Sequence, residues 1–285
     1  MGNFFEIPFH ATELPCPLPT DAEIENAPDI SMDYGGRRIV AVGQHFVVKF
    51  GLAVNLIEGE NMLFVRENTN IRVPRVYALY TNQESGKNFI VMERIIGKTL
   101  LSAWAELPPS EKKSISSALK GCFDELRRLP SPKYFGSCGK RHLLDEIFWT
   151  LDPDPLVNGP FDSEEDLNEA MTRKYVYNGG PRLRAEYFRH CFPLIFKGHE
   201  AAFTHGDLQR KNIILCDEGR AGHEAPCIVI LDWEKAGWYP SYWEFCMAVW
   251  ALKWDDDWCL WIDSVLEPYV SEAAWFQSLR LELWS

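Results

Sequence analysis

The stretch from Phe203 to Glu234 constrains the fold of this chain most strongly, because two apolar runs flank a polar turn there. The runs are Ile213–Cys216 and Cys227–Leu231, and the turn from Asp217 to Ala225 contains two glycines. Two apolar runs around such a turn predict a β-hairpin. In an antiparallel pair, the start of the first strand lies beside the end of the second. Polar residues that flank the two runs are therefore expected at one end of the hairpin.

Three oxygen-bearing side chains flank the predicted hairpin. Asn212 enters its first strand, Asp232 follows its second strand, and Asp207 lies a few residues upstream on a loop. Mg²⁺ prefers a few carboxylate and amide oxygens together with the phosphates of a substrate. The sequence therefore predicts a site for Mg²⁺ and phosphate at this end of the hairpin.

A small α+β unit is predicted before the hairpin. Its elements follow the order strand, strand, helix, strand, strand, at residues 38–42, 45–50, 54–69, 75–80 and 88–95. The first two strands are apolar runs around a short turn at Gly43, which is typical of a hairpin. Lys49 lies in the second strand, where a lysine is costly without a partner. It is either an edge-strand residue that faces water or a functional cation.

After Gly97 the pattern becomes mainly helical. Helices are predicted at 100–106, at 110–128, over about 163–175 and 181–198, and throughout 242–284. The five prolines of residues 1–30 predict a surface segment without regular elements. The chain therefore divides into a proline-rich leader (1–34), a small β-rich lobe (35–96) and a larger helical lobe (97–285).

Composition and charge exclude several classes of protein. The formal net charge of −12 argues against a nucleic-acid or anionic-membrane partner. No apolar run approaches the roughly 20 residues that cross a bilayer, and no secretory signal is visible at the N-terminus. The eight cysteines are scattered without a Cys-x-x-Cys pair, which predicts reduced thiols in a cytoplasmic protein. Nothing in the pattern indicates an oligomeric state.

Taken together, these features resemble the aminoglycoside phosphotransferase-like family of small-molecule kinases, over roughly residues 35–265. The resemblance is sharpest in His-Gly-Asp-Leu-x-x-x-Asn-Ile (205–213) and Ile-Leu-Asp-Trp-Glu (230–234). Protein kinases carry H-R-D-L-x-x-x-x-N and D-F-G at the corresponding places. No long activation segment and no Ala-Pro-Glu follow Asp232, and Pro240 comes soon after it. These departures disfavour a protein kinase and favour a small-molecule acceptor.

The resemblance implies an α+β, bilobal, protein-kinase-like fold that binds ATP and Mg²⁺ and phosphorylates a hydroxyl group of a small molecule. Asp207 would accept a hydrogen bond from the acceptor hydroxyl and align it for in-line attack. Asn212 and Asp232 would hold Mg²⁺ against the triphosphate. His205 would be a buried residue that braces the loop, in place of a general base.

The same resemblance places the nucleotide against the small lobe. Lys49 would bind the α- and β-phosphates and pair with a glutamate on the next helix. Glu60 is the favoured partner and Glu58 is the alternative. Main-chain groups near Glu93 and Ile95 would hydrogen-bond the adenine.

Two further hypotheses remain open at the level of sequence. Acid-rich stretches at 152–169 and 239–285 suggest an amine-bearing acceptor, such as an aminoglycoside or a choline-like alcohol. A full G-x-G-x-x-G motif is missing before Lys49, where only Gly35-Gly36 and Gly43 occur, so the phosphate-covering loop is expected to be short. The short loop keeps a second function in view, a weak or inactive pseudokinase that binds a nucleotide or a partner.

Overall fold

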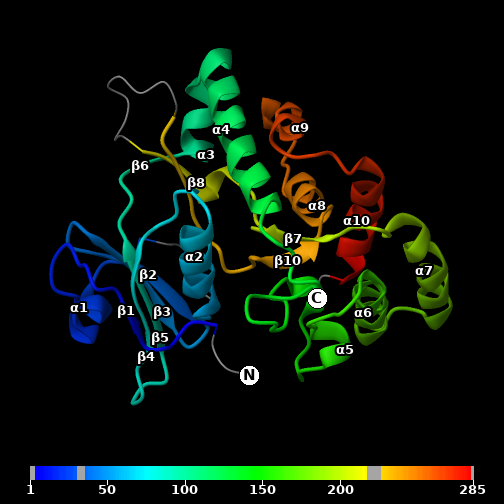
Figure 1. Cartoon of the computed structure of the whole chain (residues 1–285), viewed down its shortest axis with the longest axis horizontal. Coiled ribbons are helices and arrows are strands. Elements are labelled where there is room, and N and C mark those ends of the chain that lie inside the picture. Colours follow the sequence, from blue (N-terminus) through cyan, green and yellow to red (C-terminus); the bar gives the residue numbers. More distant parts are fainter. Residues whose placement is uncertain (1–3, 31–35, 217–225, 284–285) are drawn as a thin grey trace.

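A computed structural model describes residues 4–30, 36–216 and 226–283 and shows two lobes that meet at the end of strand β5 (Figure 1). The elements of the first lobe are β1 (Phe9–His10), α1 (Asp21–Asn26), β2 (Arg37–Val42), β3 (Phe46–Gly51), α2 (Ile57–Asn68), β4 (Val76–Thr81) and β5 (Asn88–Glu93). Its strands form one sheet in the order β1-β4-β5-β3-β2. Helix α2 lies between this sheet and the second lobe (Figure 1).

The small lobe has the predicted succession of two strands, a helix and two strands. Strand β3 lies inside the sheet, antiparallel to β2 and β5, so its residues are covered from both sides. Lys49 pairs with Ile39 and Ile90 in these ladders and is only 4% exposed. The interpretation of Lys49 as an edge-strand residue facing water is therefore wrong.

The proline-rich leader contains two elements that the sequence did not predict. Strand β1 adds to the edge of the sheet, where Phe9 pairs with Leu79. Helix α1 begins with a capping box, in which Thr20 and Glu23 each accept a hydrogen bond from the other's backbone N–H. The expectation of a leader without elements is wrong because a sheet edge and a capping box compensate for the local effect of the prolines.

The second lobe is mainly helical. Its elements are β6 (Gly97–Thr99), α3 (Leu100–Ala103), α4 (Pro109–Arg127), α5 (Pro155–Asn158), α6 (Glu164–Tyr177), α7 (Arg182–Ile195), β7 (Ala201–Thr204), β8 (Ile213–Cys216), β9 (Ile228–Ile230), β10 (Gly237–Pro240), α8 (Trp243–Trp250), α9 (Ile262–Val265) and α10 (Val270–Leu283). The continuous helix expected from 242 to 284 is wrong. Asp256 accepts a hydrogen bond from the Trp258 N–H and begins a short 3₁₀ turn between α8 and α9.

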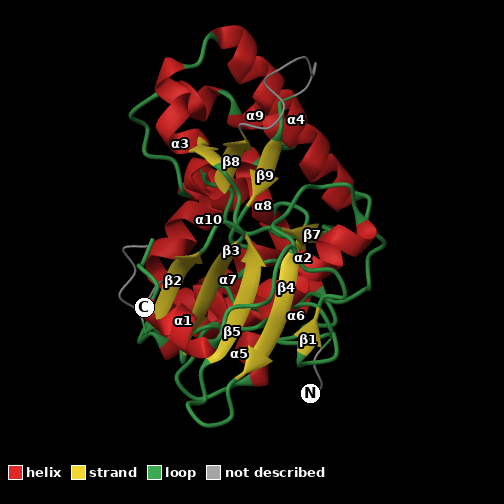
Figure 2. Ribbon diagram, turned by 90° about the vertical axis from the view of Figure 1, so that its left-hand side faces the viewer, coloured by secondary structure: helices red, strands yellow, loops and turns green. Residues whose placement is uncertain are grey.

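The predicted hairpin is confirmed by strands β8 and β9, which pair with Ile213 opposite Ile230. Strand β6 adds to the other side of β8, and Figure 2 shows these short strands beyond the sheet of the first lobe. The turn from Asp217 to Ala225 lies outside the described residues, as does Gly35. The aromatic residues after the hairpin are core, since Tyr239, Tyr242 and Trp243 are fully buried.

None of the helices in the described part of the chain combines the length and apolar character that a membrane-spanning helix needs.

Candidate active site

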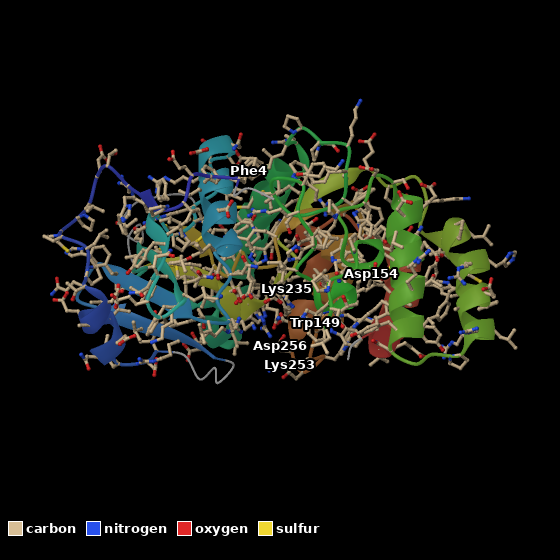
Figure 3. All side chains as sticks on the ribbon, turned by 90° about the horizontal axis from the view of Figure 1, so that it is seen from below. Phe4, Trp149, Asp154, Lys235, Lys253 and Asp256 are labelled. Atoms are coloured by element: carbon tan, nitrogen blue, oxygen red, sulfur yellow. The ribbon has the colours of Figure 1, made fainter. Side chains whose placement is uncertain are left out.

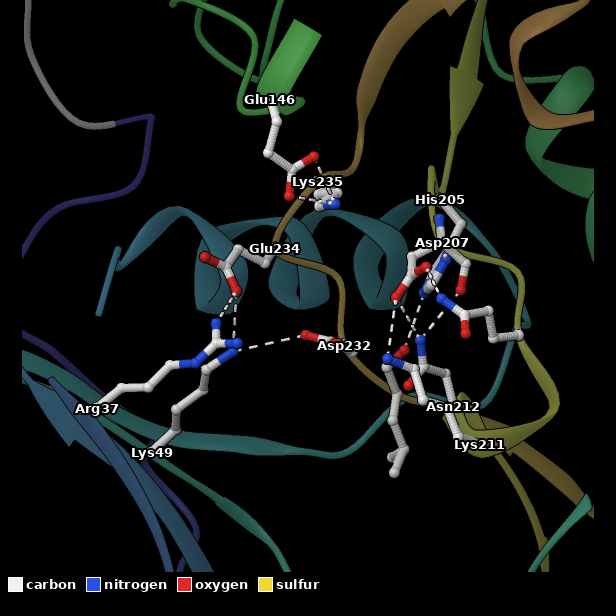
Figure 4. Close-up of polar contacts among 12 residues, drawn as sticks. Arg37, Lys49, Glu146, His205, Asp207, Lys211, Asn212, Asp232, Glu234 and Lys235 are labelled. Carbon is white, nitrogen blue, oxygen red and sulfur yellow. Dashed lines mark hydrogen bonds and ion pairs between the residues drawn. The ribbon is translucent and has the colours of Figure 1, made fainter. Parts of the chain in front are cut away.

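The loop between β7 and β8 holds the Asp207 carboxylate from both of its oxygens (Figure 4). Asn212 donates from Nδ2 to Oδ2 at 2.8 Å, and Gln209 donates from Nε2 to Oδ1 at 2.5 Å. The Lys211 ammonium lies 3.9 Å from Oδ2. Since each oxygen already has a donor, the carboxylate has one fixed orientation and retains lone pairs for a further donor.

His205 braces this loop from inside. Its Nδ1 accepts a hydrogen bond of 3.1 Å from the Asp207 N–H, so Nε2 carries the proton and donates to the Leu231 carbonyl at 2.8 Å. The residue is fully buried. It therefore fixes the distance between the Asp207 loop and the end of β9, as the sequence interpretation expected.

Glu244, at the start of α8, supports the same loop and was missed at the level of sequence. Its Oε2 accepts hydrogen bonds from the backbone N–H groups of His205 at 2.6 Å and Gly206 at 3.4 Å. Burial raises the pKa of Glu244, while His205, Arg127 and these two N–H groups lower it, and burial prevails. A carboxylate in the first turn of the very apolar helix Trp243–Trp250 is the signal that could have revealed it.

Asp232 follows β9 in the left-handed backbone region, with φ of +63°. A non-glycine residue held there is a sign of local strain, which clusters at functional sites. Burial alone would raise the pKa of Asp232, but Lys49 and other nearby cations bring it below the usual value. Asp232 is therefore an anion at neutral pH. The main-chain carbonyl of Asn212 accepts from the Leu231 N–H at 2.8 Å, which places Asn212 beside the residue that precedes Asp232.

The oxygens near Asp232 suit a hard cation such as Mg²⁺. One oxygen each from Asp232, Glu234 and Glu58 lies within 4.8 Å of the others. Glu58 is buried against Lys49, whereas Asp232 and Glu234 are partly open. With the side-chain amide of Asn212, these two carboxylates fit the oxygen donors that Mg²⁺ prefers. The roles predicted for Asn212 and Asp232 as metal ligands stay predictions.

Lys49 pairs with Glu58, so the favoured pairing with Glu60 is wrong. The Lys49 Nζ lies 2.5 Å from Glu58 Oε2, 3.1 Å from Glu234 Oε2 and 3.5 Å from Asp232 Oδ1. Burial alone would lower the pKa of Lys49, but these three carboxylates raise it above the usual value.

Glu60 lies on another face of α2 and joins the two lobes. Its carboxylate makes two bonds to the guanidinium of Arg141, at 2.9 and 3.0 Å. It also accepts from the backbone N–H groups of Phe4 and Phe5, at 2.9 and 3.3 Å. An α-helix turns about 100° per residue, so side chains two residues apart face nearly opposite directions. Glu58 and Glu60 therefore cannot both face Lys49.

Two other residues complete the group around Lys49 and were not predicted. Arg37 in β2 donates to Glu234 Oε2 at 2.9 Å, so Glu234 bridges two cations from neighbouring strands. Asn61 in α2 donates from Nδ2 to the carbonyls of Trp233 and Ala236, at 2.8 and 3.2 Å. Both contacts attach the segment that carries Asp232 to the small lobe.

Glu93 and Ile95 lie where the chain passes between the lobes. The carboxylate of Glu93 accepts from the Arg75 N–H at 3.1 Å, so this side chain is engaged within the small lobe. Ile95 is partly buried and packs on the cluster of Ile214, Cys216 and Val229. Within the described residues, the Ile95 N–H donates no backbone hydrogen bond. That main-chain groups here bind an adenine remains a prediction.

Fold and site together define a protein-kinase-like phosphotransferase. The family described as "Phosphotransferase enzyme family" (APH) matches residues 40–277. The chain therefore belongs to this family and is a small-molecule kinase that acts on hydroxyl groups. A search of curated protein sequences finds no match.

Solved structures of aminoglycoside phosphotransferases share the fold. The GDP and kanamycin complex of APH(2")-IIIa superposes with a TM-score of 0.55 at 14% identity, covering 92% of this chain and 87% of that one. The GDP complex of wild-type aminoglycoside 2'-phosphotransferase-IIIa gives a TM-score of 0.54 at 13% identity, covering 89% and 82%. At such identities the likeness shows the fold alone.

Proposed function

We propose that the protein transfers the γ-phosphoryl group of ATP, with Mg²⁺, to a hydroxyl group of a small molecule. The observation that carries the proposal is the connection between Asp207 and Asp232. Asn212 donates its side-chain amide to Asp207 and its backbone carbonyl accepts from the Leu231 N–H. An acceptor hydroxyl held at Asp207 would therefore lie close to a phosphate bound at Asp232, which is the positioning that phosphoryl transfer requires.

Each residue of the site has a distinct part in the proposed reaction. Asp207 accepts the hydrogen bond of the acceptor hydroxyl and takes its proton as the oxygen attacks the γ-phosphorus. The bond from the γ-phosphorus to the bridging oxygen breaks, which leaves ADP and a phosphate ester. Lys49 binds the α- and β-phosphates, and Glu58 holds its ammonium in place. Mg²⁺, held by Asp232 and Asn212 with Glu234 in reach, would neutralise phosphate charge.

The two solved structures compared above are both GDP complexes, which supports a purine nucleotide as the phosphoryl donor. Its base would lie at Ile95. The N–H of this residue has no backbone partner among the described residues, and its side chain packs against a small apolar cluster. The contacts proposed for Glu93 and Ile95 are main-chain contacts, so side-chain substitutions there should matter little. Competition between ATP and GTP would decide which base the site prefers.

The acids that suggested an amine-bearing acceptor are mostly engaged elsewhere. They pair with basic side chains as follows: Asp162 with Lys140, Glu164 and Glu272 with His199, Glu169 with Arg173 and Arg189, Asp256 with Arg210, Asp257 with Lys112, and Glu282 with Arg184. Asp154 caps α5. The kanamycin in one solved structure supports a small-molecule acceptor. Because these acids are already paired, they give little support to the idea that the acceptor is cationic.

Purified protein with ATP, Mg²⁺ and a panel of hydroxyl compounds tests the proposal, with ADP release as the readout. Turnover should require an acceptor and Mg²⁺, and Asp207→Asn should lower it about 10²- to 10⁴-fold. Asp162→Asn is the matched control, because Asp162 forms an exposed ion pair far along the chain from the loop. If ATP with Mg²⁺ failed to raise the melting temperature, nucleotide binding would be disproved, since a ligand of the folded state must stabilise it.

A further inference from the structure

A second polar group lies beside the Asp207 loop, and its ion pair does not include Lys49 or Asp232. Lys235 passes so close to Gly206 that a Cβ added at Gly206 would lie 3.3 Å from the Lys235 Cβ. Its Nζ contacts both oxygens of Glu146, at 2.7 and 2.8 Å. Figure 4 draws this pair away from Arg37 and Lys49, with Glu234 on one side of it and Asp207 on the other. The pair therefore lies where the non-reacting part of an acceptor would be.

The Glu146 carboxylate is supported by the buried ion pair between Arg280 and Asp145. Arg280 Nη2 lies 3.4 Å from Glu146 Oε2, and Arg280 Nη1 donates to Asp145 at 2.9 Å. Arg280 and Asp145 are each only 1% exposed, whereas the Glu146 side chain is 41% exposed. Glu146 opens a short 3₁₀ turn whose next residues, Ile147 and Phe148, are buried core. A partly open carboxylate on a buried ionic support is preorganised for a ligand.

Trp149 follows Glu146 by three residues and is partly open. Its backbone N–H donates to the Glu146 carbonyl at 3.1 Å, and the residue is 54% exposed. The fully buried Lys174 donates to the Trp149 carbonyl at 2.7 Å, which fixes the main chain. In Figure 3, Trp149 and Lys235 are both labelled in the middle of the molecule, between the sheet and the large-lobe helices. An open aromatic ring on a fixed main chain is a stacking surface.

The charges of this group balance, which bears on the class of acceptor. Lys235 and Arg280 supply two cations, and Asp145 and Glu146 supply two anions. The Lys174 ammonium already lies 5.8 Å from the Trp149 ring centroid, so a second cation on that ring would meet like charge. Lys235 still has a donor, and Glu146 still has lone pairs, for the hydroxyl groups of a ligand.

We propose that Lys235, Glu146 and Trp149 form the acceptor subsite and that this subsite takes a neutral polyhydroxylated ring, such as a sugar or a cyclitol, in preference to a polyamine. This inference rests on the proposed kinase function. Neighbouring hydroxyl groups of the ring bind the Lys235 ammonium and the Glu146 carboxylate. Its apolar face lies on Trp149, and one further hydroxyl reaches Asp207. A cationic acceptor would be repelled by the Lys235 ammonium. Asp145 and Glu146 would not compensate for this repulsion, because both already pair with cations.

The test compares two acceptor panels with ATP and Mg²⁺. One holds neutral compounds such as glucose, ribose and myo-inositol, and the other holds kanamycin, choline and ethanolamine. Turnover is expected with the neutral panel. Turnover confined to the amine-bearing panel would keep the proposed function and overturn this inference. No turnover with either panel would overturn both.

Substitutions then locate the subsite. Lys235→Met should raise the acceptor KM about 10- to 100-fold, the usual effect of losing a hydrogen bond to a charged group, with the KM for ATP unchanged. Lys235→Arg should restore part of the affinity, and Lys140→Met, which breaks an exposed ion pair of 2.8 Å, is the matched control.

Trp149→Ala should raise the acceptor KM about tenfold through lost stacking. Tyr187→Ala on α7 is its control, because Tyr187 is similarly exposed at 56%. An unchanged acceptor KM in both Lys235→Met and Trp149→Ala would overturn the assignment, as would a rise in the KM for ATP alone.

Discussion

The side-chain amide of Asn61 donates a hydrogen bond of 2.8 Å to the main-chain carbonyl of Trp233. This contact crosses from α2 of the small lobe to the segment that follows β9. Lys49 bridges the same two parts through Glu58 on α2 and Glu234 after β9. The orientation of α2 and the placement of Asp232 are therefore coupled, and a change in one should be felt at the other.

Replacing Asn61 with Leu tests this coupling at nearly constant size. It removes two hydrogen bonds and leaves the Ala236 carbonyl without its donor, while the Trp233 carbonyl keeps the bond from the Ala236 N–H, at a cost of about 2 kcal/mol. The affinity for nucleotide with Mg²⁺ should fall about tenfold or more, as measured by titration. Asn68→Leu is the control, since Asn68 bonds only within α2 and is exposed. An affinity equal to wild type in Asn61→Leu would show that α2 and Asp232 are independent.

Glu58 and Glu60 should respond differently to the same substitution. Glu58→Gln weakens the hold on Lys49 and should raise the KM for ATP with little effect on the KM of the acceptor. Glu60→Gln weakens the buried pair with Arg141 and should lower the free energy of unfolding by about 1–3 kcal/mol while leaving nucleotide binding intact. Chemical denaturation and steady-state kinetics on both variants separate the two effects. If Glu60→Gln raised the KM for ATP and Glu58→Gln lowered only the stability, Glu60 would be the partner of Lys49.

The pattern of residues predicted the two lobes and the hairpin that carries the site. Strand runs, turn glycines and the spacing between Asp207, Asn212 and Asp232 are local signals, and the structure brings these residues together. Glu58 and Glu60 show where local signals fail. Both are acidic residues in the first turn of α2, and the choice between them depends on the rotation of the helix about its axis. That rotation is fixed by Arg141, which comes 81 residues after Glu60.

Supporting residues were harder to predict because their partners are distant in the sequence. Glu244 binds backbone groups 38 and 39 residues earlier in the chain, and Lys235 meets Glu146 at a separation of 89 residues. No periodicity links such positions. Strand β1 shows the same limit, since its partner β4 lies far along the chain and prolines masked its own weak signal.

Asp207→Asn should lower kcat about 10²- to 10⁴-fold, the usual contribution of a positioned general base. Asparagine has almost the same size but presents an NH₂ group where Gln209 or Asn212 now donates. Nucleotide affinity should be unchanged, because Lys49 and Asp232 stay in place. Rapid-mix phosphoryl transfer measures the chemical step directly. A kcat within threefold of wild type would remove Asp207 from the reaction.

The pH dependence of stability provides a test of the buried pair on Lys49. Burial raises the pKa of Glu58 from 4.5 to about 7, despite the attraction of Lys49. The folded protein therefore keeps a proton that the unfolded chain releases. The stabilisation by this residue is complete below pH 4.5 and is lost as the pH rises through about 7.

Denaturation of wild type and Glu58→Gln between pH 4.5 and 8 measures this loss, because the glutamine side chain of the variant does not titrate. Relative to Glu58→Gln, wild type should lose about 3 kcal/mol of unfolding free energy over the range, since one pKa unit corresponds to about 1.4 kcal/mol. Glu67→Gln, on the exposed side of α2, should show no such difference from wild type. A constant difference between wild type and Glu58→Gln across the range would mean that Glu58 keeps an ordinary pKa beside Lys49.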